Sequence, residues 1–79
     1  MNKHKKHEIT AKVTGLKRLK NSLQGNPNYM IYTDNGVTTT RSDSMLNYKI
    51  SYNMQNETYK FYITEYKSGK TYLDNFEKI

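Results

Sequence analysis

Residues 28–41, NYMIYTDNGVTTTR, are the stretch that decides the fold of this chain. Residues 28–33 and 37–41 are rich in β-branched and aromatic side chains, which favour strands. Residues 34–36 (DNG) lie between them, and an Asn-Gly pair favours a type I′ turn, whose central residues have positive φ. The stretch therefore predicts a β-hairpin.

A second hairpin is predicted at the end of the chain. In residues 59–64 (YKFYIT) large apolar side chains alternate with more polar ones, as in a half-buried strand. Residues 67–70 (KSGK) supply the turn, and residues 71–76 form the returning strand. The side chains predicted to face the core are Tyr59, Phe61 and Ile63. The side chains predicted to share the opposite, exposed face are Lys60, Tyr62, Thr64 and Tyr66.

The segment before the first hairpin begins with another alternating strand. Ile9, Ala11 and Val13 share one face, and Gly15 either ends this strand or marks a bulge in it. Residues 16–24 (LKRLKNSLQ) are predicted to form a loop or a short helical turn, which residues 25–28 (GNPN) stop.

Between the two hairpins the sequence favours one short helical element. Residues 42–44 (SDS) are suited to cap a single helical turn over residues 45–48. Residues 49–52 are predicted to be a short strand and residues 53–58 a polar loop. Residues 1–8 are predicted to be a mobile basic tail, and residues 9–79 a single domain.

These elements predict a mainly β protein, a small barrel or bent antiparallel sheet of SH3-like or OB-like size with one short helical element. A chain of 79 residues has a small core, and its eight Tyr and two Phe are expected to supply much of it. It has no Cys, so neither a disulfide nor a thiolate metal site reinforces the fold. No apolar run approaches the roughly 20 residues that span a bilayer, and the basic N-terminus is not followed by a signal-peptide core. We therefore expect a soluble, cytoplasmic protein with no membrane partner.

The net charge of +6 lies entirely in the first twenty residues. Only Glu8 opposes the basic side chains there, whereas basic and acidic residues balance from Asn21 to Ile79. The basic residues of this segment are Lys3, Lys5, Lys6, Lys12, Lys17, Arg18 and Lys20. A basic end on a neutral body indicates a polyanionic partner.

The candidate macromolecule-binding residues fall into two sets. The first set is Lys12, Lys17, Arg18 and Lys20, and the second is Lys60, Tyr62 and Tyr66. The first set would follow a phosphate backbone with Arg18 as its best anchor, or would simply keep a small neutral body soluble. The second set would stack on unpaired bases or anchor a protein partner, or would only pack across strands.

The sequence offers no catalytic constellation. Its only histidines, His4 and His7, fall in the predicted tail, and no carboxylate or thiol cluster completes a metal site with them. The carboxylates are scattered over turns and strand edges without a histidine partner, and no phosphate-binding glycine loop is present. We therefore expect a non-enzymatic protein with no cofactor and no metal.

One set of residues resembles a known pattern. It comprises Leu16-Lys17-Arg18-Leu19, Ser22, Gly25-Asn26-Pro27-Asn28-Tyr29, Asp34, Gly36, Ser42-Asp43, Tyr48 and Ile50. Over about residues 13–50 it resembles small uncharacterised proteins from phages and mobile elements of Gram-positive bacteria. The resemblance implies a β-rich, phage-type accessory protein without an assigned activity, in which residues 25–27 fix the geometry of a loop.

Three functions are consistent with these observations. The leading hypothesis is a phage-type accessory protein that binds, and modulates or inhibits, a host protein of the replication, transcription or defence machinery. The alternative is direct, sequence-tolerant binding of DNA or RNA by the same basic surface. The third is a small virion component held by sheet-edge pairing, and exposed edges would also permit a homodimer.

Overall fold

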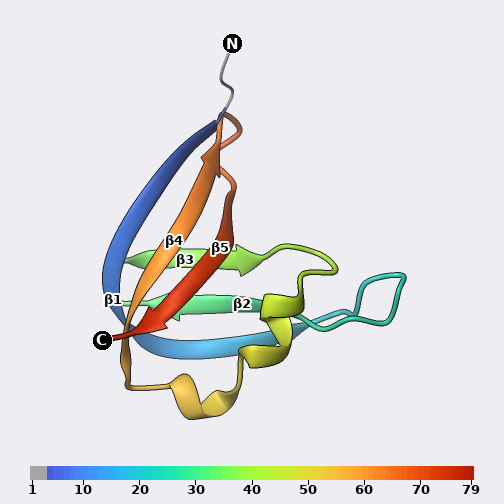
Figure 1. Ribbon diagram of the computed structural model, residues 1–79, viewed down its shortest axis with the longest axis horizontal. Helices are drawn as coiled ribbons and strands as arrows, with labels where there is room; N and C mark the ends of the chain where they lie inside the picture. Colours follow the sequence, from blue (N-terminus) through green and yellow to red (C-terminus); the bar gives the residue numbers. More distant parts are fainter. Residues whose placement is uncertain (1–3) are drawn as a thin grey trace.

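The computed structural model describes residues 4–79 and contains five strands and two short 3₁₀ helices (Figure 1). The strands are β1 (His4–Leu19), β2 (Asn28–Thr33), β3 (Gly36–Thr40), β4 (Thr58–Tyr66) and β5 (Thr71–Lys78). The 3₁₀ helices η1 (Met45–Lys49) and η2 (Tyr52–Met54) connect β3 to β4. The prediction of a small, mainly β domain with both hairpins is confirmed.

The five strands form one sheet that closes into a ring in the order β1-β2-β3-β5-β4. Every pairing is antiparallel except that of β3 with β5, which is parallel and joins only Thr39 to Tyr72 and Thr40 to Leu73. β1 pairs with two neighbours, with β4 along its first half and with β2 along its second half. Figure 1 shows β1 curving around the molecule to reach both.

β1 is longer than predicted at both of its ends. His4–Glu8 were expected to be a mobile tail, but they pair with β4, beginning with His4 opposite Tyr66. Leu16–Leu19 were expected to be a loop or helical turn, but they pair with β2 as far as Leu19 opposite Asn28. In both segments a partner strand satisfies the backbone, so strand structure forms without an apolar side-chain pattern. Residues 1–3 of the predicted tail lie outside the described residues.

The bend in β1 is a bulge at Thr14. Val13 lies opposite Thr33 whereas Gly15 lies opposite Tyr32, so Thr14 has no counterpart on β2. The extra residue increases the local twist and turns the strand from one neighbour to the other. Of the two readings of Gly15, the bulge is therefore correct.

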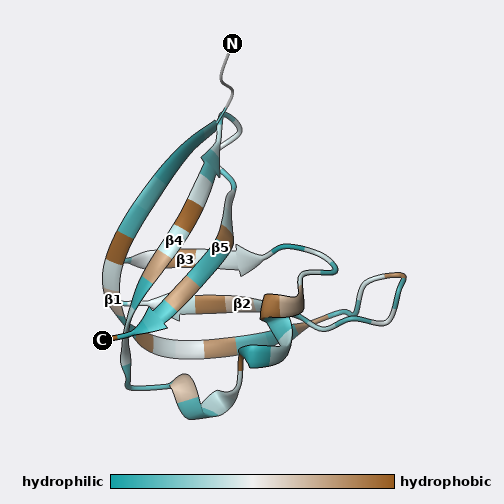
Figure 2. Ribbon diagram, in the orientation of Figure 1, coloured by the Kyte–Doolittle hydropathy of each residue, from teal (hydrophilic) through white to brown (hydrophobic). Residues whose placement is uncertain are grey.

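Buried hydrophobic side chains of β1, β2, β4 and β5 form one core together with Ile50 and Met54, and Figure 2 shows hydrophobic positions as brown bands along the strands. The buried hydrophobic residues are Ala11, Val13, Tyr29, Ile31, Ile50, Met54, Phe61, Ile63 and Leu73. The predicted inward faces of β1 and β4 are confirmed, with Ile9 and Tyr59 half-buried at their ends. Thr64, predicted on the exposed face of β4, is instead 2% exposed, and its hydroxyl donates to Asp74.

The segment between β3 and β4 differs from its prediction in one part. The helical turn forms as η1, and Ser44 caps it by accepting a hydrogen bond from the backbone N–H of Leu46. Residues 49–52 are not a strand, because Lys49 ends η1 and Tyr52 begins η2. Ile50 between the helices is 4% exposed. Met54 of η2 and Asn47 of η1 are buried as well, and Asn47 Nδ2 donates to the carbonyls of Pro27 and Arg41. These contacts hold the segment against the ring without strand pairing.

The turn of the first hairpin is also of a different type. Thr33 lies opposite Gly36, so Asp34 and Asn35 are the central residues of the turn. Among the described residues only Asp43 and Asn56 have a positive φ without being glycine, so neither central residue adopts the type I′ conformation. Gly36 instead takes the positive φ, at +118°. The side chain of Thr33 supports the turn by accepting from the N–H of Asn35 and donating to the carbonyl of Gly36.

Arg41 reinforces the short β3–β5 junction. Its Nε donates to Asp74 Oδ1 over 2.8 Å, and its NH1 donates to the hydroxyl of Tyr66 over 3.0 Å. The guanidinium carbon also lies 5.7 Å from the ring centre of Tyr66 and 5.5 Å from that of Tyr72. One side chain that follows β3 therefore contacts both β4 and β5.

We expect replacement of Arg41 to open this junction. Arg41→Met keeps the side-chain length but removes the ion pair, the hydrogen bond and the cation–π contacts, and Arg41→Lys cannot reproduce the planar fork. Either change should lower the free energy of unfolding by about 1–2 kcal/mol, or several degrees in Tm. Lys67→Met, an exposed change of the same kind, is the control for urea denaturation followed by circular dichroism. Equal stability of Arg41→Met and the control would contradict this role.

Candidate functional site

The loop between β1 and β2 is held against the β3–β4 connection by a hydrogen-bond network. Asp43 Oδ1 accepts from Ser22 Oγ over 2.5 Å and from Asn26 Nδ2 over 2.8 Å. The hydroxyl of Tyr48 donates to Asn26 Oδ1, and Asn47 Nδ2 donates to the carbonyl of Pro27 over 2.8 Å. Hydrogen bonds with η1 and with the segment before it therefore hold this loop in one conformation.

All residues of this network except Asn47 belong to the pattern on which the resemblance rests. Ser22, Asn26, Pro27, Asp43 and Tyr48 are spread over more than twenty positions of sequence, yet the structure brings them together. Asp43 has a φ of +64°, a conformation that short polar side chains tolerate better than most others. The prediction that residues 25–27 belong to a loop of fixed geometry agrees with these contacts.

The four basic candidates near this loop do not form one patch. Lys17 and Arg18 are consecutive in β1, so their side chains point to opposite faces of the sheet. Arg18 lies over the core residue Tyr29, with its guanidinium 5.4 Å from the ring centre, and its NH2 donates to Asn21 Oδ1 over 2.7 Å. Lys12 lies opposite Thr58 of β4, on the other side of the bulge. Arg18, the best expected anchor, is thus partly engaged in covering the core.

The side chains of the second set of candidates, Lys60, Tyr62 and Tyr66, also have partners within the protein. Lys60 pairs with Glu8 over 3.1 Å and lies 5.3 Å from the ring centre of Tyr62. The hydroxyl of Tyr62 donates to Glu77 Oε1 over 2.5 Å, and this hydrogen bond raises the pKa of the phenol.

Tyr66 lies in a different environment from Tyr62. Its ring contacts those of His4 and Tyr72, and its hydroxyl accepts from Arg41. Both tyrosines are half-buried, so the prediction that they are exposed beside Lys60 is wrong. Cross-strand packing is the reading of these rings that the contacts favour.

A different exposed surface lies on the outer face of β2 and β3. Tyr29 and Ile31 point into the core, so Met30 and Tyr32 point outward by the alternation of the strand. One row of outward residues crosses four strands and comprises Lys17, Met30, Thr39 and Tyr72. A second row comprises Gly15, Tyr32 and Val37. We call these two rows the β2–β3 outer face.

Two features keep aromatic surface available on the β2–β3 outer face. The ring of Tyr32 lies across Gly15, where an added Cβ would be 3.7 Å from Tyr32 Cδ2. Val37 beside Tyr32 is 48% exposed. The alternation in residues 28–33 is the sequence signal that could have identified this face.

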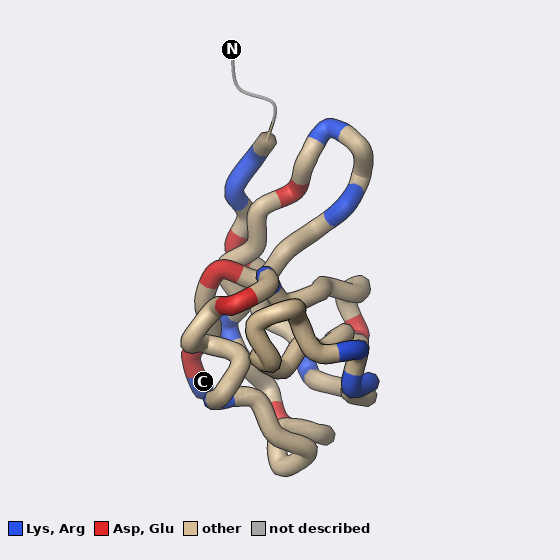
Figure 3. Tube along the Cα trace, turned by 90° about the vertical axis from the view of Figure 1, so that its right-hand side faces the viewer, with Lys and Arg blue, Asp and Glu red and all other residues tan. Residues whose placement is uncertain are grey.

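The β4–β5 turn borders the same face and carries two lysines. Lys70 lines a hollow of about 360 Å³ together with Thr39, Gly69, Thr71 and Tyr72. Figure 3 shows the basic residues of this turn beside those at the start of β1, at one end of the molecule. The strand register agrees, since His4 and Lys5 lie opposite Tyr66 and Glu65. Within residues 4–79 no ion pair neutralises Lys17, Lys67 or Lys70.

The histidines form contacts within the sheet. His4 stacks on Tyr66, and His7 Nε2 lies 3.0 Å from Glu65 Oε1. Across the described part of the chain, no group of three metal-ligating side chains is close enough to hold an ion. No helix in that part is sufficiently long and apolar to span a membrane.

Comparison of the chain with family models, curated proteins and solved structures finds no match in any of the three. The functional argument therefore rests on the geometry and charge of the chain itself.

The hydrogen bonds to two carboxylates predict a loss of stability in acid. Hydrogen bonds from Ser22 and Asn26 lower the pKa of Asp43. Burial raises the pKa of Asp74, but hydrogen bonds from Thr64 and Arg41 outweigh it and leave the pKa below its usual value. A carboxylate that is more acidic in the folded state stabilises that state above the unfolded pKa, and this contribution is lost as the pH falls through the folded pKa.

We therefore expect the free energy of unfolding to be nearly constant above about pH 5 and to fall between about pH 4 and pH 2. Asp43→Asn combined with Asp74→Asn should be less stable near pH 7 and should show a shallower fall in acid. Urea denaturation at a series of pH values measures both quantities. A fall in acid as steep as that of the unmodified chain would contradict the assignment.

Proposed function

We propose that this chain binds single-stranded nucleic acid, without strong sequence preference, across the β2–β3 outer face. The observation that carries the proposal is the row Lys17, Met30, Thr39 and Tyr72, flanked by Tyr32 and by Lys70. It places aromatic rings and unpaired positive charges on one side of a rigid sheet. Unpaired bases would stack on the rings while the lysines contact phosphates.

The architecture supports the same surface. A five-stranded ring in which β1 serves two neighbours and β3 runs parallel to β5 is the arrangement of OB-folds. OB-folds bind oligonucleotides over strands 2 and 3 and the loops between strands 1 and 2 and strands 4 and 5. In this chain those loops carry Lys20 and the pair Lys67 and Lys70. A fold alone does not establish a function, so the argument depends on these side chains.

The proposal predicts steep salt dependence for a fluorescein-labelled oligothymidylate measured by fluorescence anisotropy. The logarithm of the association constant should fall linearly with the logarithm of salt concentration, by about 0.7 per phosphate contact. Lys17→Gln with Lys70→Gln should reduce that slope by roughly two contacts. Tyr32→Leu should weaken binding by about 1–3 kcal/mol at every salt concentration and leave the slope unchanged.

Lys78→Gln is the matched control, because it removes one positive charge at the far end of β5. It should leave the slope close to that of the unmodified chain. Absence of binding at low salt would overturn the proposal. Equal effects of Lys78→Gln and of Lys17→Gln made alone would assign the binding to net charge and remove the role of this face.

A second candidate is the binding of a host protein of the nucleic-acid machinery, as a phage-type accessory protein would do. The observation that favours it is a set of exposed apolar side chains on the β1–β2 loop and η1, with Leu23 106% exposed and Met45 77% exposed. Tyr48 of η1 is 58% exposed, and its hydrogen bond to Asn26 joins η1 to the loop. The same two segments carry Lys20 and Lys49, which suits a partner with acidic residues around an apolar anchor.

A tagged copy used in a pull-down from bacterial lysate, with and without nuclease, separates the two candidates. Protein binding predicts one recovered protein that survives nuclease treatment and is lost with Leu23→Ser and Met45→Ser. Tyr32→Leu should not affect that recovery. Recovery that requires intact nucleic acid would count against the second candidate and for the first.

A further inference from the structure

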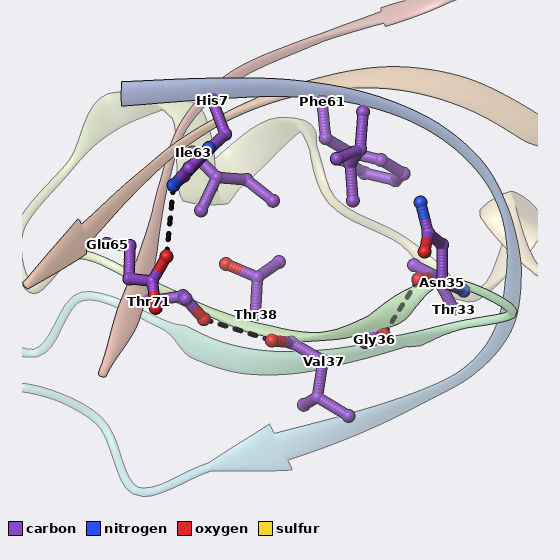
Figure 4. A pocket seen from close by; sticks show the side chains of 11 residues that line it. His7, Thr33, Asn35, Gly36, Val37, Thr38, Phe61, Ile63, Glu65 and Thr71 are labelled. Atoms are coloured by element: carbon purple, nitrogen blue, oxygen red, sulfur yellow. Dashed lines mark hydrogen bonds and ion pairs between the residues drawn. The ribbon is translucent and has the colours of Figure 1, made fainter. Parts of the chain in front are cut away.

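A pocket of about 270 Å³ opens at the mouth of the ring (Figure 4). Its apolar wall consists of Ile9, Phe61 and Ile63, from β1 and β4, and the β2–β3 hairpin forms the opposite wall. Figure 4 shows the side chain of Thr38 rising from β3 into the space beneath Ile63, whereas that of Val37 points away from it. The pocket therefore lies inside the ring, on the side opposite the β2–β3 outer face.

Thr38 is the unusual residue of this pocket. It is 3% exposed, and its Oγ1 has no hydrogen-bond partner among residues 4–79. A buried hydroxyl without a partner is costly and rare in folded proteins. Of the other polar side chains, His7 pairs with Glu65, Thr71 donates to the carbonyl of Val37 over 3.0 Å, and Asn35 lies exposed at the rim. Thr38 thus supplies the one buried and unused side-chain hydroxyl of the lining, and in this conformation its Oγ1 is shielded from water.

We infer that this pocket binds one aromatic ring that carries a single hydroxyl group, as in a phenol. The ring would lie against Phe61 and Ile63, and a small displacement of the Thr38 side chain would bring its Oγ1 into hydrogen-bond contact with the hydroxyl of the ring. The volume is sufficient, because an apolar protein cavity of about 150 Å³ already holds benzene. A nucleobase fits less well, because several of its polar atoms would lie against the apolar wall of Ile9, Phe61 and Ile63. The inference is independent of the proposed function, which concerns the outer face.

Phenol and toluene, titrated separately and followed by ¹H–¹⁵N NMR, test the inference. Both should shift the amide signals of residues 36–38 and 61–63 in a saturable manner, with phenol binding about three- to tenfold more tightly. Thr38→Val, of nearly the same shape, should abolish that preference. Thr39→Val, on the outward side of β3, should preserve it.

Ile9→Phe provides a second variant that fills the pocket from β1, and it should remove binding of both compounds. The source of the ring is distinguished with N-acetyltyrosinamide. Binding comparable to that of phenol identifies the side chain of a protein partner as the ligand, and binding of phenol alone identifies a small molecule. Equal affinities for phenol and toluene, or no saturable shift at the lining residues, would overturn the inference.

Discussion

The whole structure depends on one strand that serves two neighbours. β1 contains 16 residues and could not remain flat while pairing with both β4 and β2. The extra residue at Thr14 redirects it, and the backbone groups beside the bulge find partners outside the regular ladder. Val13 donates to the carbonyl of Glu57 and accepts from the N–H of Asn56, while Asp34 donates to the carbonyl of Lys12. The bend therefore costs few backbone hydrogen bonds, and it closes one side of the ring, where β2 and β4 would otherwise each expose an edge.

The pairing of β3 with β5, on the opposite side of the ring from β1, is the shortest in the sheet. This short pairing accounts for both the pocket over Thr38 and the extent of the β2–β3 outer face. β3 and β5 share only two residue pairs, so these two strands separate beyond them. Inside, the divergence leaves the pocket over Thr38. Outside, it places Tyr72 next to Thr39 and continues the β2–β3 outer face onto a fourth strand. Arg41 and the Thr71–Val37 hydrogen bond then provide part of the attachment that a longer ladder would have given.

The parts of this fold that could be predicted from the sequence are those specified within a few residues. Both hairpins have local turn signals and a period of two, and the cap at Ser44 lies next to the helix that it begins. The ends of β1 could not be found in this way, because His4–Glu8 are strand only through β4, more than fifty residues away. The Asn35-Gly36 pair does not predict the type of the first turn, because the hydrogen bonds of Thr33 and the positive φ of Gly36 determine its geometry.

The same distinction applies to the charge of the N-terminal segment. In the sequence its basic residues are one cluster, but in the structure they are distributed over the sheet. Lys5 lies opposite Glu65, Lys17 points outward beside Met30, and Arg18 covers Tyr29. Lys17 shares the outer face not with its neighbours in sequence but with Lys70, which comes from the other end of the chain. A strand places consecutive side chains on opposite faces of the sheet, whereas closure of the ring brings strands together that are distant in sequence. The surface that a polyanion would contact is therefore determined by the strand register more than by the composition of the N-terminal segment.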